Sequence, residues 1–430
     1  MSRPLAKRQK TTATSKPSPS NDNNEDKHVL FTTWAQERGV RINGVVAAKL
    51  PGRGLGLMTT QKIKKDEQIL FVPEKAMFKP SQSTLKKNNL SRISAQAQLA
   101  ISALLAFEPT TSPLRLWQQT WPTVTDFTQC MPLYWRPEFQ ALVPPPVNLP
   151  FDRQRADFEK DWVSVETFCK AEGWSREQFL YYWMIVNSRS FHWKPPKGSA
   201  GSMVMCPFID YMNHGPTDTT CNVFQRSDGY EVLANRDYDP NEEILATYGS
   251  HPNDKLLVHY GFVSSAEPGT PPSKDDDIRL DHLILPKLDT NTRDQLQDLG
   301  FLGGYALLPA TNELCFKTQV AVRAALLTCN EWEYFAGNGE DLTGDKADAV
   351  REYLIPLLRE YSTDCVKKTE EIGKLRHKVD DLQRGSLDML QTRWNQISDA
   401  LEIFIKGPKD VDPVEAYKEK YEANKSRKSI

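Results

Sequence analysis

The feature that most constrains the fold is a long helical segment between two strand-rich segments. Residues 44–74, GVVAAKLPGRGLGLMTT followed by IKKDEQILFVPE, have the β-branched residues and turn punctuation of short strands. The same character returns at 203–248, in SMVMCPFID, CNVFQRSDGYEVLA and EEILATYG. Between them, Ala95–Phe107 and residues 150–190 have helix formers and apolar spacing, with Ser175 as a predicted helix cap. The chain order is therefore strands, a helical insert over about 90–188, and strands again.

The C-terminal part is predicted to be mostly helical and to follow a linker. The segment 267–277, EPGTPPSKDDD, interrupts any periodicity, so we place a linker at 266–277 and a separate region at 278–430. A strand is predicted at LDHLILP, 280–286. Two apolar stripes follow, and RGS at 384–386 is predicted to turn between two helices that pack on each other. The stripes are Ile372, Leu375, Val379 and Leu382, then Leu387, Leu390, Trp394, Ile397 and Leu401.

The N-terminal tail is predicted to be disordered over 1–27. Its first twenty residues carry five positive side chains and no acid, with many Ser, Thr and Pro, so they cannot bury much apolar surface. Order is expected to begin near Val29. The KRQK cluster at 7–10 has two interpretations, a nuclear-import signal or an ordinary basic tail.

Charge, apolar runs and cysteines narrow the class of protein. Lys and Arg total 54 against 56 Asp and Glu, so no basic field favours nucleic-acid binding. We find no apolar run near the ~18 residues of a membrane span and no secretory signal, which favours the nucleus or the cytoplasm. The seven cysteines form no C-x-x-C pair, which argues against a metal site. Nothing in the pattern favours a particular oligomeric state.

Taken singly, the motifs have ordinary structural interpretations. The cluster GRGLGL at 52–57 is not a dinucleotide fingerprint, and alone it is typical of a hairpin turn, although glycine also lets backbone approach a ligand closely. Asn213 and His214 lie on a predicted loop, where an amide commonly ties down backbone. Tyr248 and Tyr260, each followed by glycine, would usually be core residues with bonded hydroxyls.

Together and in this order, the motifs resemble those of the SET-domain methyltransferases. GRGLGL, NSRSF at 187–191, DYMNHG at 210–215, ILATYG at 244–249 and HYGFV at 259–263 follow one another around the helical insert. The resemblance is greatest to the branch of plant Rubisco large-subunit lysine methyltransferase and its non-histone relatives, and it covers about Phe31 to Val263. It implies an α+β fold, with a β-rich SET domain over 28–265 and an all-α C-terminal substrate-binding domain.

The resemblance also implies S-adenosylmethionine as the methyl donor and assigns residues to it. Arg189 would face the donor's carboxylate, where a guanidinium can bond both oxygens. Tyr248 would be the catalytic tyrosine of the lysine channel. The remaining donor-binding positions would be Arg53, Gly54 and Leu55 along its amino-acid end, Asn213 and His214 holding it from a loop, and Tyr260 and Phe262 beside the adenine.

Methyl transfer to an amine suits these residue types. The reaction is an in-line displacement, which depends mainly on positioning and needs no metal. With a reference pKa of about 10, the Tyr248 hydroxyl is a poor base at neutral pH, so we assign it to aligning the amine. A histidine-methylating member of this branch has Asn and Trp at two substrate-facing places. Here they hold Phe191 and Ile209, and an apolar wall favours lysine.

The sequence therefore predicts a protein-lysine N-methyltransferase that acts on a non-histone protein, with ribosomal or translation components as one class of target. Two alternatives stay open: a non-catalytic SET scaffold that binds a partner protein, and a protein-histidine methyltransferase. Two departures from the family pattern are Gly215, where many relatives have a small polar residue, and Asn241, where relatives often have Gly. Asn tolerates the left-handed conformation, so the turn at 239–242 should be kept.

Overall fold

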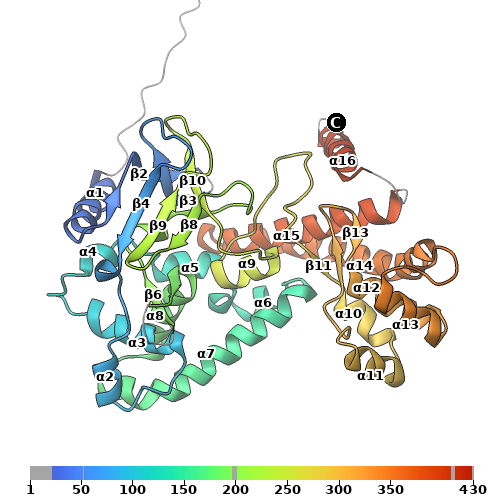
Figure 1. Ribbon diagram of the computed structural model, residues 1–430, viewed down its shortest axis with the longest axis horizontal. Coiled ribbons are helices and arrows are strands. Elements are labelled where there is room, and N and C mark those ends of the chain that lie inside the picture. The colour runs from blue at the N-terminus through green and yellow to red at the C-terminus, as the bar shows by residue number, and fades with distance from the viewer. Residues whose placement is uncertain (1–21, 52, 196–200, 408–411, 429–430) are drawn as a thin grey trace, which may run out of the picture.

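The chain folds into two lobes joined by long helices. The computed structural model describes residues 22–51, 53–195, 201–407 and 412–428. In Figure 1 the sheets of the first lobe lie on the left and the C-terminal helices on the right. Helix α7 (Pro145–Ala171) runs diagonally below the sheets, and α15 (Asp381–Lys406) extends from the C-terminal lobe towards the sheets.

Strands from both sides of the helical insert share the same sheets. One sheet has the order β1-β4-β9-β8 and the other β2-β3-β10-β7, while β5 and β6 form a two-stranded ribbon. This confirms the predicted α+β class, because no sheet of four could form without both strand-rich segments. The strands are β1 (Arg41–Ile42), β2 (Val45–Leu50), β3 (Gly54–Thr59), β4 (Gln68–Pro73), β5 (Ser190–Trp193), β6 (Ser202–Met205), β7 (Asn213–His214), β8 (Asn222–Gln225), β9 (Gly229–Leu233) and β10 (Glu243–Ala246).

The second sheet brings three predicted motifs together. Strand β10 pairs antiparallel with the glycine-rich β3, through Ile244 and Leu57. On its other side β10 pairs in parallel with β7, so that Leu245 faces Asn213 and Ala246 faces His214. The chain then leaves β10 towards Tyr248. The segments that carry Gly54, Asn213 and Tyr248 are thus neighbours at one end of this sheet.

The helical insert is confirmed, and one of its helices begins at the cap that the sequence predicts. Helix α3 spans Ala95–Phe107, and Ser175 caps α8 (Arg176–Arg189) by accepting a hydrogen bond from the Gln178 amide at 3.2 Å. Helices α3 and α8 pack against each other in the core of the first lobe. The other insert helices are α4 (Arg115–Gln118), α5 (Val124–Cys130) and α6 (Pro137–Gln140), and α2 (Gln82–Lys87) precedes them.

The N-terminal prediction needs a correction. Helix α1 spans Asp22–Glu37, so it begins several residues before the predicted start of order near Val29. Phe31 and Trp34 anchor this helix, because both are buried and stack on each other at 5.5 Å between ring centroids. Residues 1–21, with the KRQK cluster, lie outside the described residues.

The C-terminal region is mostly helical, with one addition and one correction. It carries a small three-stranded sheet in the order β11-β12-β13, which the sequence analysis did not include. The strand predicted at 280–286 is wrong: Asp281–Ile284 forms helix α10, and Asp281 stabilises it by accepting hydrogen bonds from the amides of Gly304 and Tyr305. The remaining elements are β11 (Ile278–Arg279), β12 (Ala306–Leu308), β13 (Glu313–Leu314), α9 (Asn253–Tyr260), α11 (Thr290–Asp298), α12 (Phe316–Leu326), α13 (Cys329–Asn338), α14 (Ala347–Arg376) and α16 (Pro413–Lys428).

The predicted helical hairpin exists, but its turn lies earlier. Helices α14 and α15 are joined at 377–380, where Asp380 caps α15 by accepting a hydrogen bond from the Gln383 amide. RGS at 384–386 is helical, and the buried Ser386 hydroxyl donates to the Gln129 carbonyl at 2.7 Å. The capping aspartate therefore determines where the turn lies, and the glycine of RGS is a helical residue of α15.

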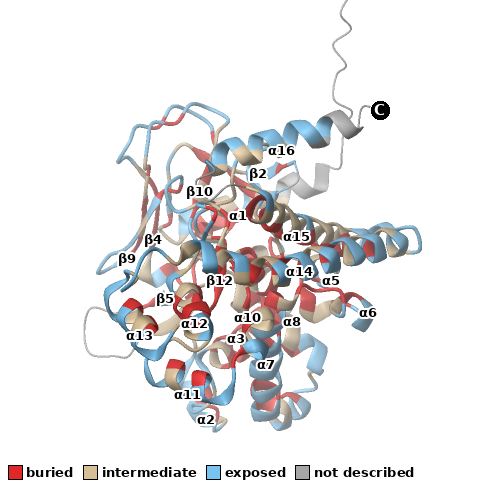
Figure 2. Cartoon of the chain, turned by 90° about the vertical axis from the view of Figure 1, so that its right-hand side faces the viewer, coloured by how far each residue is buried: buried red, intermediate tan, exposed pale blue. Residues whose placement is uncertain are grey.

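The described chain has two hydrophobic cores. The first gathers buried residues between Phe31 and Ala246, and the second those of the C-terminal lobe. Residues 135–151 of the insert, and Leu257 with Val258 of α9, belong to the second core. Figure 2 shows buried residues along α7 and α15, whereas α16 is largely exposed. The insert and α9 thus join the two lobes.

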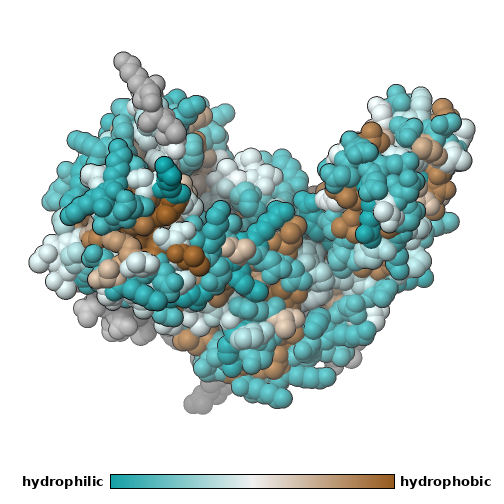
Figure 3. Space-filling view, turned by 90° about the horizontal axis from the view of Figure 1, so that it is seen from below, coloured by the Kyte–Doolittle hydropathy of each residue, from teal (hydrophilic) through white to brown (hydrophobic). Residues whose placement is uncertain are grey.

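Viewed from below, the molecule is hollowed between the two lobes, and hydrophilic residues cover most of this face (Figure 3). Among the described residues, no helix has the length and apolar character that crossing a bilayer requires. Over the same ranges, no group of three or more His, Cys, Asp or Glu residues is arranged to hold a metal ion.

Asp161 should be a major determinant of the stability of the first lobe. Its buried Oδ2 accepts hydrogen bonds from Ser94 Oγ, at the start of α3, and from Trp183 Nε1 of α8. We expect Asp161→Ala to lower the free energy of unfolding by about 1–3 kcal/mol, because it leaves the buried Trp183 Nε1 without a partner, whereas the exposed Ser94 hydroxyl can bond to water. Urea unfolding measures this. The control is Asp152→Ala, which lies on α7 like Asp161. It removes only an exposed ion pair with Arg155, so the free energy of unfolding should change by under about 0.5 kcal/mol. Equal effects of the two substitutions would contradict this assignment.

Candidate functional site

The loop between β6 and β7 is held by two predicted site residues. Arg189, the last residue of α8, donates from Nη1 to the Asp210 carbonyl at 3.1 Å and to Asp210 Oδ2 at 3.2 Å. The Tyr248 hydroxyl donates to the Met212 carbonyl at 2.8 Å. The two side chains therefore end on carbonyl groups only two residues apart. The structure brings Arg189 and Tyr248 together, as the predicted site requires.

The start of this loop has a strained backbone. Phe208 has a φ of 71°, a left-handed conformation that a bulky residue rarely adopts and that costs on the order of 1–3 kcal/mol. Packing holds it there: its buried ring contacts Tyr211 at 5.3 Å and Phe31 at 6.3 Å between centroids. The strained turn leads directly to Asp210, so packing around Phe208 helps to set where the Arg189 partner lies.

A second set of contacts fixes Asn213 and His214. Asn213 Nδ2 donates to Glu243 Oε1 at 2.9 Å, and Arg53 Nη1 lies 3.3 Å from the other oxygen of the same carboxylate. Arg53 Nη2 also donates to the His214 carbonyl at 2.9 Å. Four residues from two strands, β7 and β10, and from the turn before β3 thus form one connected group. It positions Arg53 and Asn213 side by side at the end of the second sheet.

The glycines near Arg53 act in different ways. Gly54 has a φ of 75° and open space around it, and Leu55 packs partly against the first core. A Cβ on Gly56 would lie 2.5 Å from Leu50 Cδ1 and 2.7 Å from Asn213 Nδ2. The space left by the missing Cβ of Gly56 is therefore filled by neighbouring protein side chains. Gly52 lies outside the described residues.

Aromatic rings gather around Tyr248. Its ring centroid lies 4.8 Å from that of Tyr260, 5.3 Å from His214 and 6.4 Å from Phe262. His214 Nδ1 also accepts a hydrogen bond from the Tyr248 amide at 3.2 Å. The predicted adenine-side residues, Tyr260 and Phe262, thus share one cluster with the predicted catalytic tyrosine. All four rings come from segments that follow β6 and β10.

Burial sets the protonation of this cluster. It raises the pKa of Tyr248 to about 12, so the phenol stays protonated and able to donate at neutral pH. It also lowers the pKa of His214 to about 4, which leaves the imidazole neutral and able to accept the Tyr248 amide. Burial raises the pKa of Asp210 as well, although the Arg189 guanidinium opposes this. The Tyr248 and His214 side chains are therefore both neutral hydrogen-bonding groups at neutral pH.

The two predicted substrate-facing residues have different surroundings. Phe191 lies in β5, is partly exposed and contacts the Tyr230 ring at 5.6 Å between centroids. Ile209 is only 2% exposed and belongs to the first core. Both flank residues of the Arg189–Asp210 pair. Their role in a substrate wall stays a prediction, and Phe191 is the one whose side chain reaches the surface.

Several residues that build the site were missed from the sequence. Asp210 and Glu243 are the carboxylates that hold Arg189, Asn213 and Arg53, and both stood inside quoted motifs without an assigned role. Asn187 donates to the His259 carbonyl at 2.6 Å and its Oδ1 lies 3.2 Å from His259 Nδ1, which ties α8 to α9. The only feature of the sequence that could have identified these residues is that each is polar and stands near a predicted site residue in the chain.

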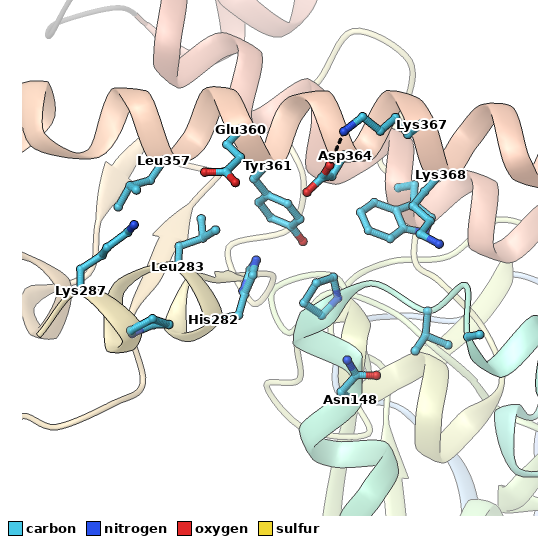
Figure 4. A pocket seen from close by; sticks show the side chains of 15 residues that line it. Asn148, His282, Leu283, Lys287, Leu357, Glu360, Tyr361, Asp364, Lys367 and Lys368 are labelled. Atoms are coloured by element: carbon cyan, nitrogen blue, oxygen red, sulfur yellow. Dashed lines mark hydrogen bonds and ion pairs between the residues drawn. The ribbon is translucent and has the colours of Figure 1, made fainter.

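A cavity of about 590 Å³ lies away from these residues (Figure 4). It separates α14 from α10 and the start of α7, and Tyr361, His282 and Trp394 are among its lining residues. Figure 4 shows Tyr361 and His282 pointing towards one another, and their ring centroids lie 4.7 Å apart. Both the Tyr361 hydroxyl and His282 Nε2 are covered and lack a hydrogen-bond partner among the described residues. None of the predicted site residues lines this cavity.

Comparisons with known proteins confirm the resemblance that the motifs indicate. The family model of the SET domain matches residues 54–249, which contain Arg189, Asn213 and Tyr248. SET domain-containing protein 4 of Mus musculus is 23% identical over 397 residues, which cover 86% of this chain and 87% of that protein.

Solved structures show the same fold. The SET domain of LSMT bound to lysine and AdoHcy has a TM-score of 0.57 at 16% identity, and covers 88% of this chain and 92% of its own. Rubisco LSMT bound to sinefungin and monomethyllysine has a TM-score of 0.60 at 16% identity, and covers 87% of this chain and 91% of its own. The matched 87–88% of the chain is too large to lie within one lobe, so the shared fold extends over both lobes.

Gly56 should be required for the packing of Arg53, Asn213 and Glu243. We expect Gly56→Ala to lower the free energy of unfolding by about 1–3 kcal/mol, because the added methyl group meets Leu50 and Asn213 at less than contact distance. Urea unfolding measures this. Gly337→Ala in α13 is the matched control: nothing lies within 4 Å of its Cβ, so the substitution should be neutral or stabilising. A Gly56→Ala protein as stable as the wild type would contradict the packing described here.

Proposed function

We propose that this chain, which carries a SET domain, is an S-adenosylmethionine-dependent protein-lysine N-methyltransferase that acts on a non-histone protein. The observation that carries the proposal is the convergence of Arg189 and Tyr248 on the carbonyl groups of Asp210 and Met212. This arrangement supports a site in which the Arg189 guanidinium would hold the donor's carboxylate and the protonated Tyr248 phenol would meet the reacting amine. The shared fold with LSMT, which binds lysine and AdoHcy, supports the same chemistry.

The donor would lie across the end of the second sheet. Arg189 uses Nη1 for Asp210, and its other guanidinium nitrogens are directed to no acceptor among the described residues, so they can bond a carboxylate. Arg53, Gly54, Leu55 and Asn213 would border the amino-acid end. Tyr260 and Phe262 would pack beside the adenine, because both rings already belong to the cluster around Tyr248.

The transfer step is a displacement at the methyl carbon. A neutral lysine amine attacks this carbon, the bond from carbon to sulfur breaks, and methyl-lysine and S-adenosylhomocysteine form. Free lysine has a pKa of about 10.4, so the amine must lose a proton before attack, and a desolvated channel near a sulfonium favours that loss. The proton leaves to solvent, because Tyr248, with a pKa of about 12, holds its own proton at neutral pH.

Tyr248 would therefore act by alignment. Its hydroxyl hydrogen is committed to the Met212 carbonyl, which leaves the oxygen lone pairs to accept an N–H bond from the amine. Such a bond turns the nitrogen lone pair towards the methyl group, and correct orientation supplies much of the rate of a displacement. The apolar Phe191, partly exposed near Arg189, suits the alkyl stem of lysine better than an imidazole that needs a hydrogen bond.

The substrate class is part of the proposal. A non-histone target is supported by the likeness to Rubisco LSMT over both lobes, and ribosomal or translation components remain one class to test. We place the protein in the nucleus, the cytoplasm or both. Incubation with labelled S-adenosylmethionine and cell extract, followed by mass spectrometry of the labelled band, tests the substrate. Methyl groups on lysine of a non-histone protein are expected; labelling confined to histidine or to histones would contradict the proposal.

Tyr248→Phe should separate binding from turnover. We expect the turnover number to fall about 10–100-fold, because the amine loses its aligning acceptor, while the protein still binds S-adenosylmethionine. Donor binding is measured as a rise in melting temperature with ligand, since a ligand that binds only the folded state stabilises it. Undiminished turnover would remove the role of Tyr248. A wild-type protein with no rise at high ligand concentration would favour a non-catalytic scaffold.

A further inference from the structure

A fully buried arginine of the C-terminal lobe has every donor occupied. Arg393, on α15, donates from Nε and Nη2 to the two oxygens of Asp254 at 2.7 and 3.1 Å. Nη1 donates to Asp276 Oδ2 at 2.8 Å and to Gln396 Oε1 at 3.3 Å, and Nη2 also donates to the Asp277 carbonyl at 3.1 Å. All five N–H groups of the guanidinium are thus bonded in the absence of solvent, since Arg393 is 0% exposed.

The partners of Arg393 hold both ends of one short segment. Asp254 lies in the first turn of α9, and its neighbour Asn253 forms two hydrogen bonds with Ser264, beyond the end of the same helix. Asn253 Oδ1 accepts from the Ser264 amide at 2.7 Å, and Nδ2 donates to the Ser264 carbonyl at 3.0 Å. Gln396, one turn after Arg393, donates to that carbonyl at 2.9 Å. Residues 253–264 therefore form a segment whose two ends are bonded to each other and to α15. We call this segment the clasp.

This clasp carries the aromatic edge of the candidate site. Tyr260 and Phe262 lie inside it, on either side of the left-handed Gly261 that ends α9. Their rings stand 4.8 and 6.4 Å from that of Tyr248. The C-terminal half of α9 has its own supports, because the Val258 carbonyl accepts from Gln154 and the His259 carbonyl from Asn187. The N-terminal half of α9 and Ser264, in contrast, are tied to α15 through Arg393 and Gln396.

A buried charged group of this kind contributes more to fixing the geometry around it than to the stability of the fold. Desolvation of two carboxylates and a guanidinium is costly, and a well-packed apolar replacement commonly stabilises a protein as well as a buried ion pair does. Burial raises the pKa of the Asp254 carboxyl, although the Arg393 guanidinium opposes this. Burial also opposes the charged form of Arg393, but the carboxylates of Asp254 and Asp276 outweigh it and keep the pKa of the guanidinium raised. What an apolar residue cannot supply is a bond direction: the planar fork of an arginine fixes Asp254 and Asp276 at set angles.

We propose that Arg393 is a positioning residue for the donor-binding edge, through which the C-terminal lobe sets where Tyr260 and Phe262 stand against Tyr248. The inference rests on the proposed function, because it assigns these two rings to the donor. It gives the C-terminal lobe a role in cofactor affinity, in addition to the protein-substrate binding that the family resemblance implies.

The test is a titration of S-adenosylmethionine into the full-length chain by calorimetry, at a temperature where circular dichroism shows each variant folded. We expect Arg393→Met to raise Kd on the order of tenfold. The Kd of Arg393→Lys should lie between those of Arg393→Met and the wild type, because one ammonium cannot reach both carboxylates. At a saturating concentration of donor, the kcat of each variant should stay within about threefold of the wild-type value, since the loss is in binding rather than in the transfer step.

Arg323→Met is the matched control. Arg323 is equally buried, and its partners Asp341, Gln319 and Phe335 all lie in the C-terminal lobe. It should lose stability while its Kd for the donor stays at the wild-type value. If Arg393→Met does not fold, Gln396→Leu takes its place. It removes the hydrogen bond from α15 to the Ser264 carbonyl, while the bonds between Ser264 and Asn253 remain, so it should raise Kd in the same direction by a smaller factor.

The outcomes separate the two proposals. A wild-type chain that does not bind S-adenosylmethionine would overturn the proposed function itself. A wild-type chain that binds, with Gln396→Leu and any folded Arg393 variant binding equally well, would overturn the role of Arg393 alone. A Kd raised as much by Arg323→Met as by Arg393→Met would overturn it too, because the effect would then follow stability rather than position.

Discussion

The carbonyl groups of Asp210 and Met212 are the acceptors on which the candidate site depends. One receives Arg189 from the end of the helical insert, and the other receives Tyr248 from beyond the last strand of the first lobe. These two side chains are 59 positions apart, and only a shared anchor brings them to one place. The anchor itself is a loop whose strained Phe208 is held by core packing, so the geometry of the site is set by the core beneath it.

Helix α9 links this site to the second lobe. Its residues Leu257 and Val258 are buried in the C-terminal core, while Tyr260 at its end contacts Tyr248. The helix is bonded to the insert through Gln154 and Asn187 and to α15 through Arg393. A change in the packing of either lobe would therefore reach the aromatic cluster through a single helix of eight residues.

Much of the architecture could be predicted because it depends on local signals. The apolar spacing of Ala95–Phe107 and the cap at Ser175 are written in neighbouring residues, and both helices form as expected. Asn241 adopts a φ of 69°, which the conformational tolerance of asparagine anticipates at that turn. Arg189 and Tyr248 could be paired because the order of the motifs resembles a known family, since nothing in their spacing states that they meet.

What failed to be predicted depends on contacts between distant residues. Residues 281–284 form a helix because Asp281 receives the amides of Gly304 and Tyr305, more than twenty positions later. Glycine at 385 suggested a turn, but Asp380 caps α15 and Ser386 bonds to Gln129 of the insert, so the helix continues through it. The carboxylates Asp210 and Glu243 likewise show their role only when their cationic partners are brought beside them.

A crystal structure of the chain with S-adenosylhomocysteine bound tests the central claim most directly. The account predicts the product's carboxylate within about 3 Å of the Arg189 guanidinium, its adenine beside Tyr260 and Phe262, and its sulfur facing the Tyr248 hydroxyl. Product bound elsewhere, with Arg189 and Tyr248 both out of its reach, would contradict it.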